Sequence, residues 1–465
     1  MNIVVLNGSP KGEHSITLAY LHYVQTCFPE YRYSVIHVAK DIQTIERSPD
    51  RFDRITNRIR AADALVWLYG VWVLLVPAQM VRFLELIRER NQRHVFAGKY
   101  SASMSTSIHY LDHFAEHYIR AESEDLGMQF FDHLSLDIRD LMNAEKRGNI
   151  RRFFSYFVAS ANRRQPLPKH TATLTLPQFR YRPQPAAPPP DVKGKRVLIL
   201  SDSQRNGSNL HHMTQRFAAR CGTNARVVTI AELGLQGGCV GCMRCGRDNS
   251  CIYRDGFEQF YNETVMSADV IIFAVTIAGR FVSSEFKTFL DRAYFWTHTP
   301  SLAGTTIGYL VEGSLCEHLN TRQFLEATVT ARQHALFAGI VTDECADTTT
   351  LNALIDDFAA TCLQYTSDRY AKGFNFLMHG AHKVFRDYNW AGIRLIWQAD
   401  HRFYRKHRLY DFPQRNWLKN LLLSLLMVLT RIPAVKRSID TNIRTMPASR
   451  LRKFIDTRLV NRRSA

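Results

Sequence analysis

Four closely spaced cysteines are the clearest chemical feature of the sequence. Cys239, Cys242, Cys245 and Cys251 have the spacing C-x2-C-x2-C-x5-C. Three thiolates at steps of three residues can wrap a compact loop around one iron-sulfur cluster, and a fourth a few residues later closes the shell. Zinc sites more often divide into two separated C-x2-C pairs. The spacing predicts these residues as metal ligands and favours iron-sulfur over zinc. Four unliganded or redox-active thiols on a loop are the alternative.

A polar loop near the N-terminus is the second candidate site. The segment Asn7–Thr17 follows the apolar run Ile3–Leu6 and leads into residues with helical apolar spacing. The N–H groups of a first helical turn and the helix dipole both favour an anion there. The loop is therefore predicted to bind a phosphate group, and an ordinary helix N-cap with a turn proline is the alternative. Its hydroxyl donors are Ser9, Ser15 and Thr17.

Two later loops should lie at the same edge of a sheet, because ligands of open α/β sheets bind outside the carboxyl ends of the strands. One is Tyr69–Leu74, which contains Gly70, Val71, Trp72 and Val73, and the other is Thr106–His109, which contains Thr106, Ser107 and His109. Trp72 can stack against a planar ring. His109 can touch that ring's edge, or make local hydrogen bonds at the start of a helix. No side chain stands out as a catalytic acid or base.

The elements that position these loops alternate between strand and helix. Strands are predicted at 3–6, 35–38, 64–68 and 100–105, with helices at 52–62 and 79–90. The pattern begins again after a proline-rich stretch, with strands at 196–200, 227–230, 270–275 and 306–311 and a helix at 284–293. Such alternation predicts parallel β-α-β units and doubly wound sheets. We therefore predict an α/β domain at 1–164, a linker at 165–194, a second α/β domain at 195–370 and a basic helical C-terminal region at 371–465.

The charge is concentrated in the C-terminal region. Residues 371–465 hold 20 Lys plus Arg against five acidic residues, which accounts for +15 of the chain's net +18. The two-domain body therefore offers no strong case for nucleic-acid binding. Asn416–Leu429 is an apolar stretch with helical character, and its uncharged core Asn420–Thr430 is too short to span a bilayer. We expect it to dock on the protein, with peripheral contact at an anionic membrane surface as an alternative.

The sequence also predicts a location. The N-terminus MNIVVLNGSP lacks the pattern of a signal peptide, and the cysteine count of nine is odd. Clustered cysteines of this kind are typical of a reducing compartment. We therefore predict a cytoplasmic protein, peripheral at the membrane if its C-terminal region makes the membrane contact.

The loop Asn7–Thr17 resembles the N-G-S-P-[RK] phosphate loop of the flavodoxin-like NAD(P)H-dependent FMN reductases and iron-sulfur flavoproteins. The resemblance extends over Met1–Asp368 and implies two tandem flavodoxin-like domains. It implies that Ser9, Lys11, Ser15 and Thr17 hold the FMN phosphate and that Gly70–Val73 lies beside the flavin ring. Gly70 and Trp72 replace the family's proline and tyrosine there. The cysteine run, with Asp255 after it, resembles the motif that holds a 4Fe-4S cluster in iron-sulfur flavoproteins.

The second copy departs from that pattern. Asp202 and Gln204 replace the glycine and proline of the phosphate loop, and the ring loop Thr276–Ala278 has lost the proline and the aromatic residue. It keeps the helix Phe286–Arg292, which is close to the family's L-K-x-F-x-D-R. We therefore expect flavin in the first domain and a weak or empty site in the second.

The resemblance implies an FMN-dependent NAD(P)H oxidoreductase. No G-x-G-x-x-G motif follows a predicted strand, so NAD(P)H as the donor comes from the resemblance alone. Electrons would pass to the cluster or to a small-molecule or protein acceptor. Iron-sulfur flavoproteins are homo-oligomers, so this chain could be one as well, or a fused pair that places Trp72 near Cys242. The alternative function is a non-enzymatic electron carrier or redox-sensing metal-binding protein.

Overall fold

The computed structural model describes the chain except residues 175–178, 186–193, 204, 223–224, 334, 346, 412–415, 444 and 461–465. The predicted linker prolines Pro188–Pro190, and Gln204, lie outside the described residues. The chain divides into two compact units. The first unit comprises Met1–Thr173, Gly238–Met243 and Thr430–Ala465, and the second comprises Leu174–Gly237 and Arg244–Leu429.

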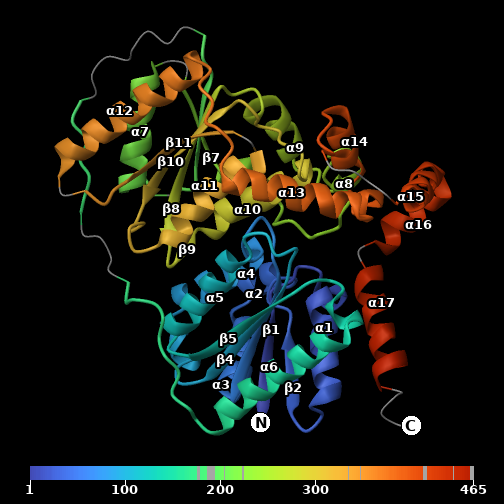
Figure 1. The fold of residues 1–465 in the computed structure, drawn as a ribbon. Coiled ribbons are helices and arrows are strands. Elements are labelled where there is room, and N and C mark those ends of the chain that lie inside the picture. The colour runs from blue at the N-terminus through green and yellow to red at the C-terminus, as the bar shows by residue number, and fades with distance from the viewer. Residues whose placement is uncertain are drawn as a thin grey trace. The chain divides into compact units, whose positions relative to one another are not determined.

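A five-stranded parallel sheet forms the centre of the first unit (Figure 1). Its strands are β1 (Asn2–Asn7), β2 (Arg32–Ile36), β3 (Ala64–Gly70), β4 (Tyr100–Thr106) and β5 (Gln129–Leu136). Their order is β2-β1-β3-β4-β5. The order reverses between β1 and β3, and this switch point is where ligands bind in doubly wound sheets.

Helices connect and cover the strands of the first unit: α1 (Ile16–Cys27), α2 (Ile42–Arg47), α3 (Pro49–Arg60), α4 (Ala78–Glu89), α5 (His113–Asp125) and α6 (Ala144–Asn162). Leu21 of α1 and Phe157 of α6 belong to one buried cluster with Val5 of β1 and Val66 of β3. The C-terminal helix α17 (Met446–Phe454) packs against α1 and adds Leu451 to this cluster. One face of the sheet is thus covered by α1 and α6.

The second unit repeats the arrangement. Its strands are β6 (Val197–Ser201), β7 (Ala225–Thr229), β8 (Val270–Ala278), β10 (Thr306–Glu312) and β11 (Leu336–Thr342), with the short antiparallel β9 (Phe281–Val282) paired to the end of β8. The order is β11-β10-β8-β6-β7, which is the order of the first sheet read from its other edge. Its main covering helices are α7 (Asn209–Cys221), α10 (Ser284–Arg292), α11 (Leu319–Gln333) and α12 (Thr348–Ser367). The predicted pair of parallel α/β sheets is confirmed.

The C-terminal region is helical, as predicted. Its helices are α13 (Phe376–Trp390), α14 (Gln398–Lys406), α15 (Trp417–Leu429), α16 (Pro433–Asn442) and α17. Among the described residues, no single helix is long and apolar enough to cross a bilayer, whereas α15 and α16 pass that test only when taken together as a bent pair.

Three strands were absent from the prediction: the two-residue β9, and the longer β5 and β11. Strands β5 and β11 each lie at an edge of their sheet. Strand β5 has the burial pattern iBieiiiB, and β11 contains a glycine. Neither β5 nor β11 is buried continuously along its length, so neither shows the pattern of a central parallel strand.

Candidate functional site

The loop after β1 is organised by Asn7, a fully buried side chain. Its Oδ1 accepts a hydrogen bond from the Ser9 N–H at 3.0 Å, and its Nδ2 donates to the Gly12 carbonyl at 3.2 Å. The same Nδ2 lies 2.9 Å from His37 Nδ1. The Asn7 amide thus connects Ser9 and Gly12 within the loop to His37 beside it, and these contacts fix the curvature of the loop.

Two glycines let this loop fold so tightly. The Gly8 N–H donates to the Leu68 carbonyl on β3 at 2.7 Å. A Cβ at Gly8 would lie 2.1 Å from Met80 Sδ, so a larger residue cannot occupy the position without a shift. Gly12 has φ +56°, in the left-handed region that glycine adopts without strain.

The start of α1 suits an anion. Ser15 is the N-cap residue, but its side chain makes no capping hydrogen bond to the helix backbone. Its hydroxyl instead lies 2.8 Å from the hydroxyl of Thr17. The first N–H groups of an α-helix have no partner within the helix, and this N-cap side chain does not supply one. Ser9, Ser15 and Thr17 are all buried, so the predicted phosphate residues form an enclosed, hydroxyl-rich turn. This donor set fits a phosphate.

The loop after β3 lies next to the loop after β1, and its backbone is strained. Trp72 and Leu75 exchange backbone hydrogen bonds of 2.7 Å and 3.1 Å across a tight turn. The two central residues, Val73 and Leu74, have φ of 44° and 66°. Such values favour glycine or asparagine, and for a β-branched valine they are outliers. Strain of this kind is typical of ligand-binding loops, where other contacts hold the conformation.

The third predicted loop lies beside the second. The Val71 N–H donates to the Thr106 carbonyl at 3.0 Å, and Gly70 pairs with Thr106 across β3 and β4. A Cβ at Gly70 would lie 3.2 Å from Trp72 Nε1, so the indole packs closely over that backbone. The structure thus brings the Gly70–Val73 and Thr106–Ser107 loops together at the carboxyl end of the sheet.

Asp112 holds the third loop, and sequence reasoning did not identify it. The Ser107 and Ser135 hydroxyls each donate to its Oδ2 at 2.6 Å, and His109 Nδ1 lies 3.2 Å away. Burial opposes the charge, but the hydrogen bonds from His109, Ser107 and Ser135 keep the pKa of this carboxyl well below its usual range. The hydrogen bond to Asp112 raises the pKa of His109. His109 therefore makes the local hydrogen bonds that were one of its two predicted roles.

A short segment of the first unit, Gly238–Met243, lies against Trp72 of the loop Gly70–Val73. A Cβ at Gly241 would lie 2.4 Å from Trp72 Cη2 and 2.7 Å from Lys11 Cε. Gly241 also has φ +63°, which favours glycine independently. The segment carries Cys239 and Cys242, so two of the four predicted metal ligands lie in the same unit as the predicted flavin residues.

Gln79, at the start of α4, anchors this segment. Its Nε2 donates to the Cys239 carbonyl at 3.0 Å, and a Cβ at Gly238 would collide with its side chain at 2.7 Å. Its Oε1 is buried and, among the described residues, has no hydrogen-bond partner. A buried acceptor of this kind costs free energy unless a ligand or water donates to it. Gln79 Oε1 is thus a polar atom of the candidate site that is open to a donor.

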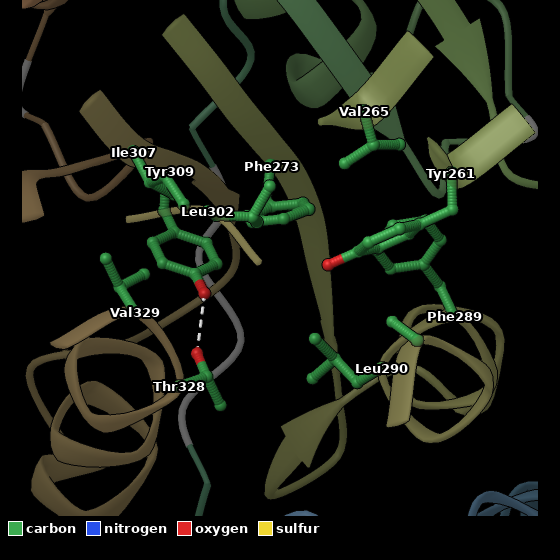
Figure 2. Close-up of a pocket in the computed structure, with 11 residues that line it drawn as sticks. Tyr261, Val265, Phe273, Phe289, Leu290, Leu302, Ile307, Tyr309, Thr328 and Val329 are labelled. Atoms are coloured by element: carbon green, nitrogen blue, oxygen red, sulfur yellow. Dashed lines mark hydrogen bonds between the residues drawn. The ribbon is translucent and has the colours of Figure 1, made fainter. Parts of the chain in front are cut away.

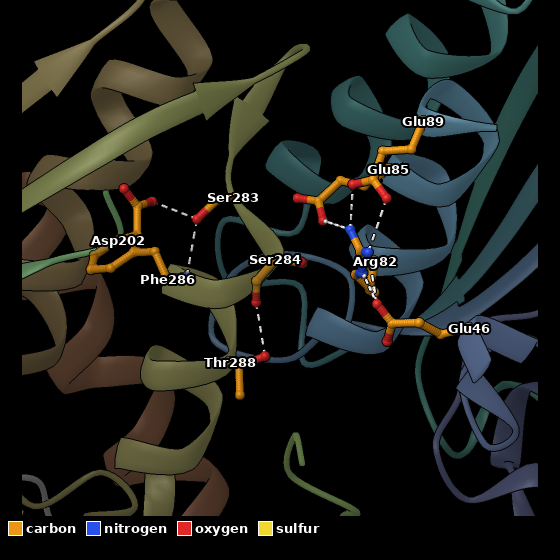
Figure 3. Close-up of polar contacts among 9 residues, drawn as sticks. All are labelled: Glu46, Arg82, Glu85, Glu89, Asp202, Ser283, Ser284, Phe286 and Thr288. Atoms are coloured by element: carbon orange, nitrogen blue, oxygen red, sulfur yellow. Dashed lines mark hydrogen bonds and ion pairs between the residues drawn. The ribbon is translucent and has the colours of Figure 1, made fainter. Parts of the chain in front are cut away.

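Helix α4 itself is fixed by a charged cluster. Arg82 donates to Glu46 on α2 at 2.7 Å, to Glu85 at 3.0 Å and to Glu89 at 2.6 Å (Figure 3). The guanidinium therefore joins α2 to α4 and holds the helix that carries Gln79.

The C-terminal helix α17 reaches the phosphate loop within the first unit. Arg452 Nη2 donates to the Glu13 carbonyl, and its Nε is buried without a hydrogen-bond partner among the described residues. His22 of α1 lies 2.8 Å from Asp456, just after α17. A guanidinium thus lies at the loop that was predicted to bind an anion.

The remaining two cysteines, Cys245 and Cys251, belong to the second unit. Cys245 begins the one-turn helix α8 (Cys245–Asp248), and the Cys251 N–H donates to Glu258 at 2.8 Å. Within the described part of the chain, no group of three or more His, Cys, Asp or Glu side chains is arranged to hold a metal ion. The assignment of the four cysteines as metal ligands therefore stays a prediction from their spacing.

Arg292 of α10 contacts the residues that precede and follow the cysteine run, Gly237 and Asp255, in the second unit. It forms a two-pronged ion pair with Asp255 at 2.8 Å and 2.9 Å and donates to the Gly237 carbonyl at 3.0 Å. Its guanidinium also lies 4.0 Å from the centre of the Tyr253 ring. Burial opposes the charge on Asp255, but the hydrogen bonds from Arg292 outweigh it and lower the pKa of the carboxyl. Arg292, the last residue of the helix motif Phe286–Arg292, thus has a structural role here.

The second copy of the phosphate loop is satisfied internally. Its N-cap residue, Ser208, accepts a hydrogen bond from the His211 N–H at 3.1 Å, so α7 is capped by its own sequence. Asp202 accepts from the Thr276 N–H at 2.9 Å and from the hydroxyl of Ser283 (Figure 3). The carboxylate therefore binds the ring loop of its own unit, and burial raises its pKa to about 7.

We predict a pH-dependent stability from Asp202. Its pKa is about 7 in the folded protein and about 3.9 in an unfolded chain, so between these values the folded state binds the extra proton. Stability should therefore fall as the pH rises from about 4 to 7, by on the order of 1 kcal/mol per pH unit. Urea unfolding of wild type and Asp202→Asn at several pH values measures this. The stability difference between the two proteins should shrink or reverse with rising pH, and a constant difference contradicts the assignment.

The second unit also contains a small internal cavity, which is not a flavin site. It has a volume of about 20 Å³ and lies between β8, β10 and the helices that cover them (Figure 2). Its lining is apolar apart from Tyr261, Tyr309 and Thr328, and Tyr309 Oη lies 2.8 Å from Thr328 Oγ1. Such a volume has room for about one water molecule.

Sequence reasoning missed the residues that hold the loops: Asn7, Gln79, Asp112 and Arg452. Asn7 was visible as the first letter of the phosphate-loop motif, but its side-chain role was not assigned. The other three act through contacts that local patterns do not encode. Gln79 and Cys239, for example, are 160 residues apart in the chain.

A family model described as NADPH-dependent FMN reductase matches residues 1–131 and 195–338, more than half of the chain. The two matched segments correspond to the two parallel sheets. Among curated proteins, none matches the chain.

Solved structures of flavoenzymes are similar at low identity. The NAD(P)H:acceptor oxidoreductase FerB from Paracoccus denitrificans is 13% identical, with a TM-score of 0.30 and coverage of 35% of this chain and 97% of FerB. General stress protein 14 from Treponema denticola, in complex with FMN, is 11% identical, with a TM-score of 0.27 and coverage of 35% and 99%. The NAD(P)H:quinone oxidoreductase from Methanothermobacter marburgensis is 14% identical, with a TM-score of 0.27 and coverage of 37% and 98%.

Proposed function

The chain belongs to the NADPH-dependent FMN reductase family and is an NAD(P)H-dependent FMN oxidoreductase, and from this premise we propose that it holds a single FMN, in the first unit. The proposed site comprises the loop Asn7–Thr17, the ring loop Gly70–Val73 and the loop Thr106–His109. The second copy keeps the fold without a working flavin site.

One contrast between the two copies carries this proposal. In the first unit the N-cap Ser15 leaves the start of α1 without a side-chain cap, whereas in the second unit Ser208 caps α7. An uncapped helix start can donate its N–H groups to a phosphate, and a capped one has less to offer. Asp202, which has no counterpart in the first unit, adds a carboxyl group beside the second loop.

The chain's own residues would bind and orient the cofactor. Bound FMN supplies the hydride and electron chemistry, and the protein supplies position and electrostatics. The hydroxyls of Ser9, Ser15 and Thr17 would donate to the phosphate, with Lys11 as a cation. We add Arg452, because its guanidinium already lies at the Glu13 carbonyl of this loop. Trp72 would lie beside the ring, and Gln79 Oε1 would accept from a donor on it.

Flavin stoichiometry tests the asymmetric proposal. We expect acid-released flavin to be FMN at about one per chain, because only one copy keeps the phosphate site. Chromatography identifies and quantifies the released flavin, and amino-acid analysis gives the protein concentration, so that the ratio of flavin to chain can be calculated. FAD, or two FMN per chain, contradicts a single site in the first unit.

An iron-sulfur cluster is a second, separate proposal. Its support is the C-x2-C-x2-C-x5-C spacing of Cys239 to Cys251, and the described side chains form no ligand group that adds to it. If the cluster forms, protein purified without oxygen should contain iron and acid-labile sulfide, and Cys242→Ser should remove both while FMN stays bound, because a hydroxyl is a poor iron ligand. Iron-free protein with four thiols open to alkylation contradicts the cluster and leaves the flavin proposal intact.

The acceptor, the location and the assembly are proposed from the sequence. A small-molecule or protein acceptor would take the electrons. A cytoplasmic location is proposed from the clustering of four of the nine cysteines. A homo-oligomer is proposed by analogy with iron-sulfur flavoproteins.

A further inference from the structure

Helix α15 presents an apolar face to solvent. Trp417 and Leu422 are 66% and 58% exposed, although such side chains are usually buried. At 100° per residue, the strongly exposed apolar residues fall within less than half of the helix circumference. They are Trp417, Leu418, Leu421, Leu422, Leu425, Val428 and Leu429. No polar or charged side chain interrupts this set, which we call the leucine face.

The opposite side of α15 contacts the protein. Asn420, Leu423 and Met427 are half-buried on that side. Arg394 donates to the Asn420 carbonyl at 3.1 Å, and Lys419 donates to the Ala391 carbonyl at 3.4 Å. The contacts on this opposite side therefore set the orientation of α15, and among the described residues nothing covers the leucine face. Contiguous exposed apolar surface of this kind marks an interaction site.

The residues that adjoin α15 in the sequence carry only positive charges. No acidic residue occurs between Asp411 and Asp440. Arg431, Lys436 and Arg437, which follow α15 in the chain, are exposed. An apolar helix face with lysine and arginine close to it in the sequence is typical of helices that lie in the interface of an anionic bilayer.

We propose that the leucine face of α15 docks the protein on an anionic membrane surface. The apolar side chains enter the boundary between headgroups and acyl chains, and the flanking lysine and arginine side chains contact the headgroups. The helix has 13 residues and is about 20 Å long, so it lies in the interface and does not cross the bilayer. A second copy of the chain is the poorer occupant, because it would bring like charges together.

Vesicle sedimentation of the full-length protein tests this. We expect binding to vesicles that contain phosphatidylglycerol and much weaker binding to pure phosphatidylcholine. Leu421→Asp with Leu425→Asp should lower the partition coefficient at least about tenfold, because two charges enter the leucine face. The matched control is Leu319→Asp with Leu354→Asp, which makes the same change at two exposed leucines on α11 and α12. It should bind like wild type.

A second variant tests the charges. Lys436→Gln with Arg437→Gln should weaken binding to the anionic vesicles and reduce its dependence on salt. Equal binding to both vesicle types, or equal loss in the Leu319 and Leu354 control, overturns the proposal. So does a lack of vesicle binding together with self-association, measured by ultracentrifugation, that Leu421→Asp with Leu425→Asp abolishes, because the face would then join two copies of the chain.

Discussion

Replacing both Ser9 and Ser15 with alanine should strip most of the FMN from the purified protein. Each hydroxyl is expected to donate to the phosphate, and a hydrogen bond to a charged group contributes about 1.5 to 3 kcal/mol. Loss of both should raise the FMN dissociation constant by at least about a hundredfold. Fluorescence titration of the apoprotein with FMN measures this constant, and the flavin content after purification gives an independent readout.

The second copy provides the matched control. Ser203 and Ser208 occupy the positions of Ser9 and Ser15 relative to β6 and α7. Their replacement by alanine should leave the FMN constant unchanged, although loss of the Ser208 cap should cost about 1 kcal/mol of stability. Unchanged FMN affinity in the Ser9 and Ser15 variant, or a comparable loss in the control, means that the flavin site was assigned to the wrong copy.

Arg292→Met should destabilise the second unit by about 3 to 5 kcal/mol. The side chains of Arg292 and Asp255 are 1% and 3% exposed, so removal of the cation leaves a buried carboxylate without its partner. The variant also releases the Gly237 carbonyl, at the other end of the cysteine run. Urea unfolding measures the loss of stability. Alkylation of the cysteines in native buffer should become faster, because the ends of the run are no longer tied together.

Two further variants separate charge from packing. Arg292→Lys keeps the charge but not the two-pronged geometry, so it should lose less stability than Arg292→Met. Arg292→Met combined with Asp255→Leu removes both charges and should recover part of the loss, because a buried pair can be exchanged for apolar residues. If the double variant is no more stable than Arg292→Met, the loss comes from packing around Tyr253 and not from the unpaired carboxylate.

The buried strands were predictable because both faces of a parallel sheet are covered. Apolar runs such as Ile3–Leu6 and Val270–Val275 therefore reveal their strands directly. Strands β5 and β11 were not predicted, because neither is buried continuously along its length. The position of the three candidate loops also followed from the sequence, since each comes directly after a predicted strand and the carboxyl ends of parallel strands share one edge.

The side chains that shape the site were harder to predict. Asp112 was not identified from the sequence, yet it gathers Ser107, His109 and Ser135 around one oxygen. Asp202 was identified only as a departure from the family's phosphate loop. In the structure it instead accepts hydrogen bonds from Thr276 and Ser283, and burial shifts its pKa. Ser135, Thr276 and Ser283 are distant in the chain from the carboxylates they bind, and only the folded sheet places them nearby.

The sequence by itself determined the family, the two parallel sheets and the loops at the switch point of the first. These features depend on local patterns, apolar runs followed by polar turns, which the chain carries within a few residues. The tertiary structure alone decided that Gly238–Met243 belongs to the first unit, against Gln79 and Trp72, and that α15 keeps its leucine face exposed. Contacts between residues far apart in the chain depend on how whole elements pack, and no local pattern of residues specifies that packing.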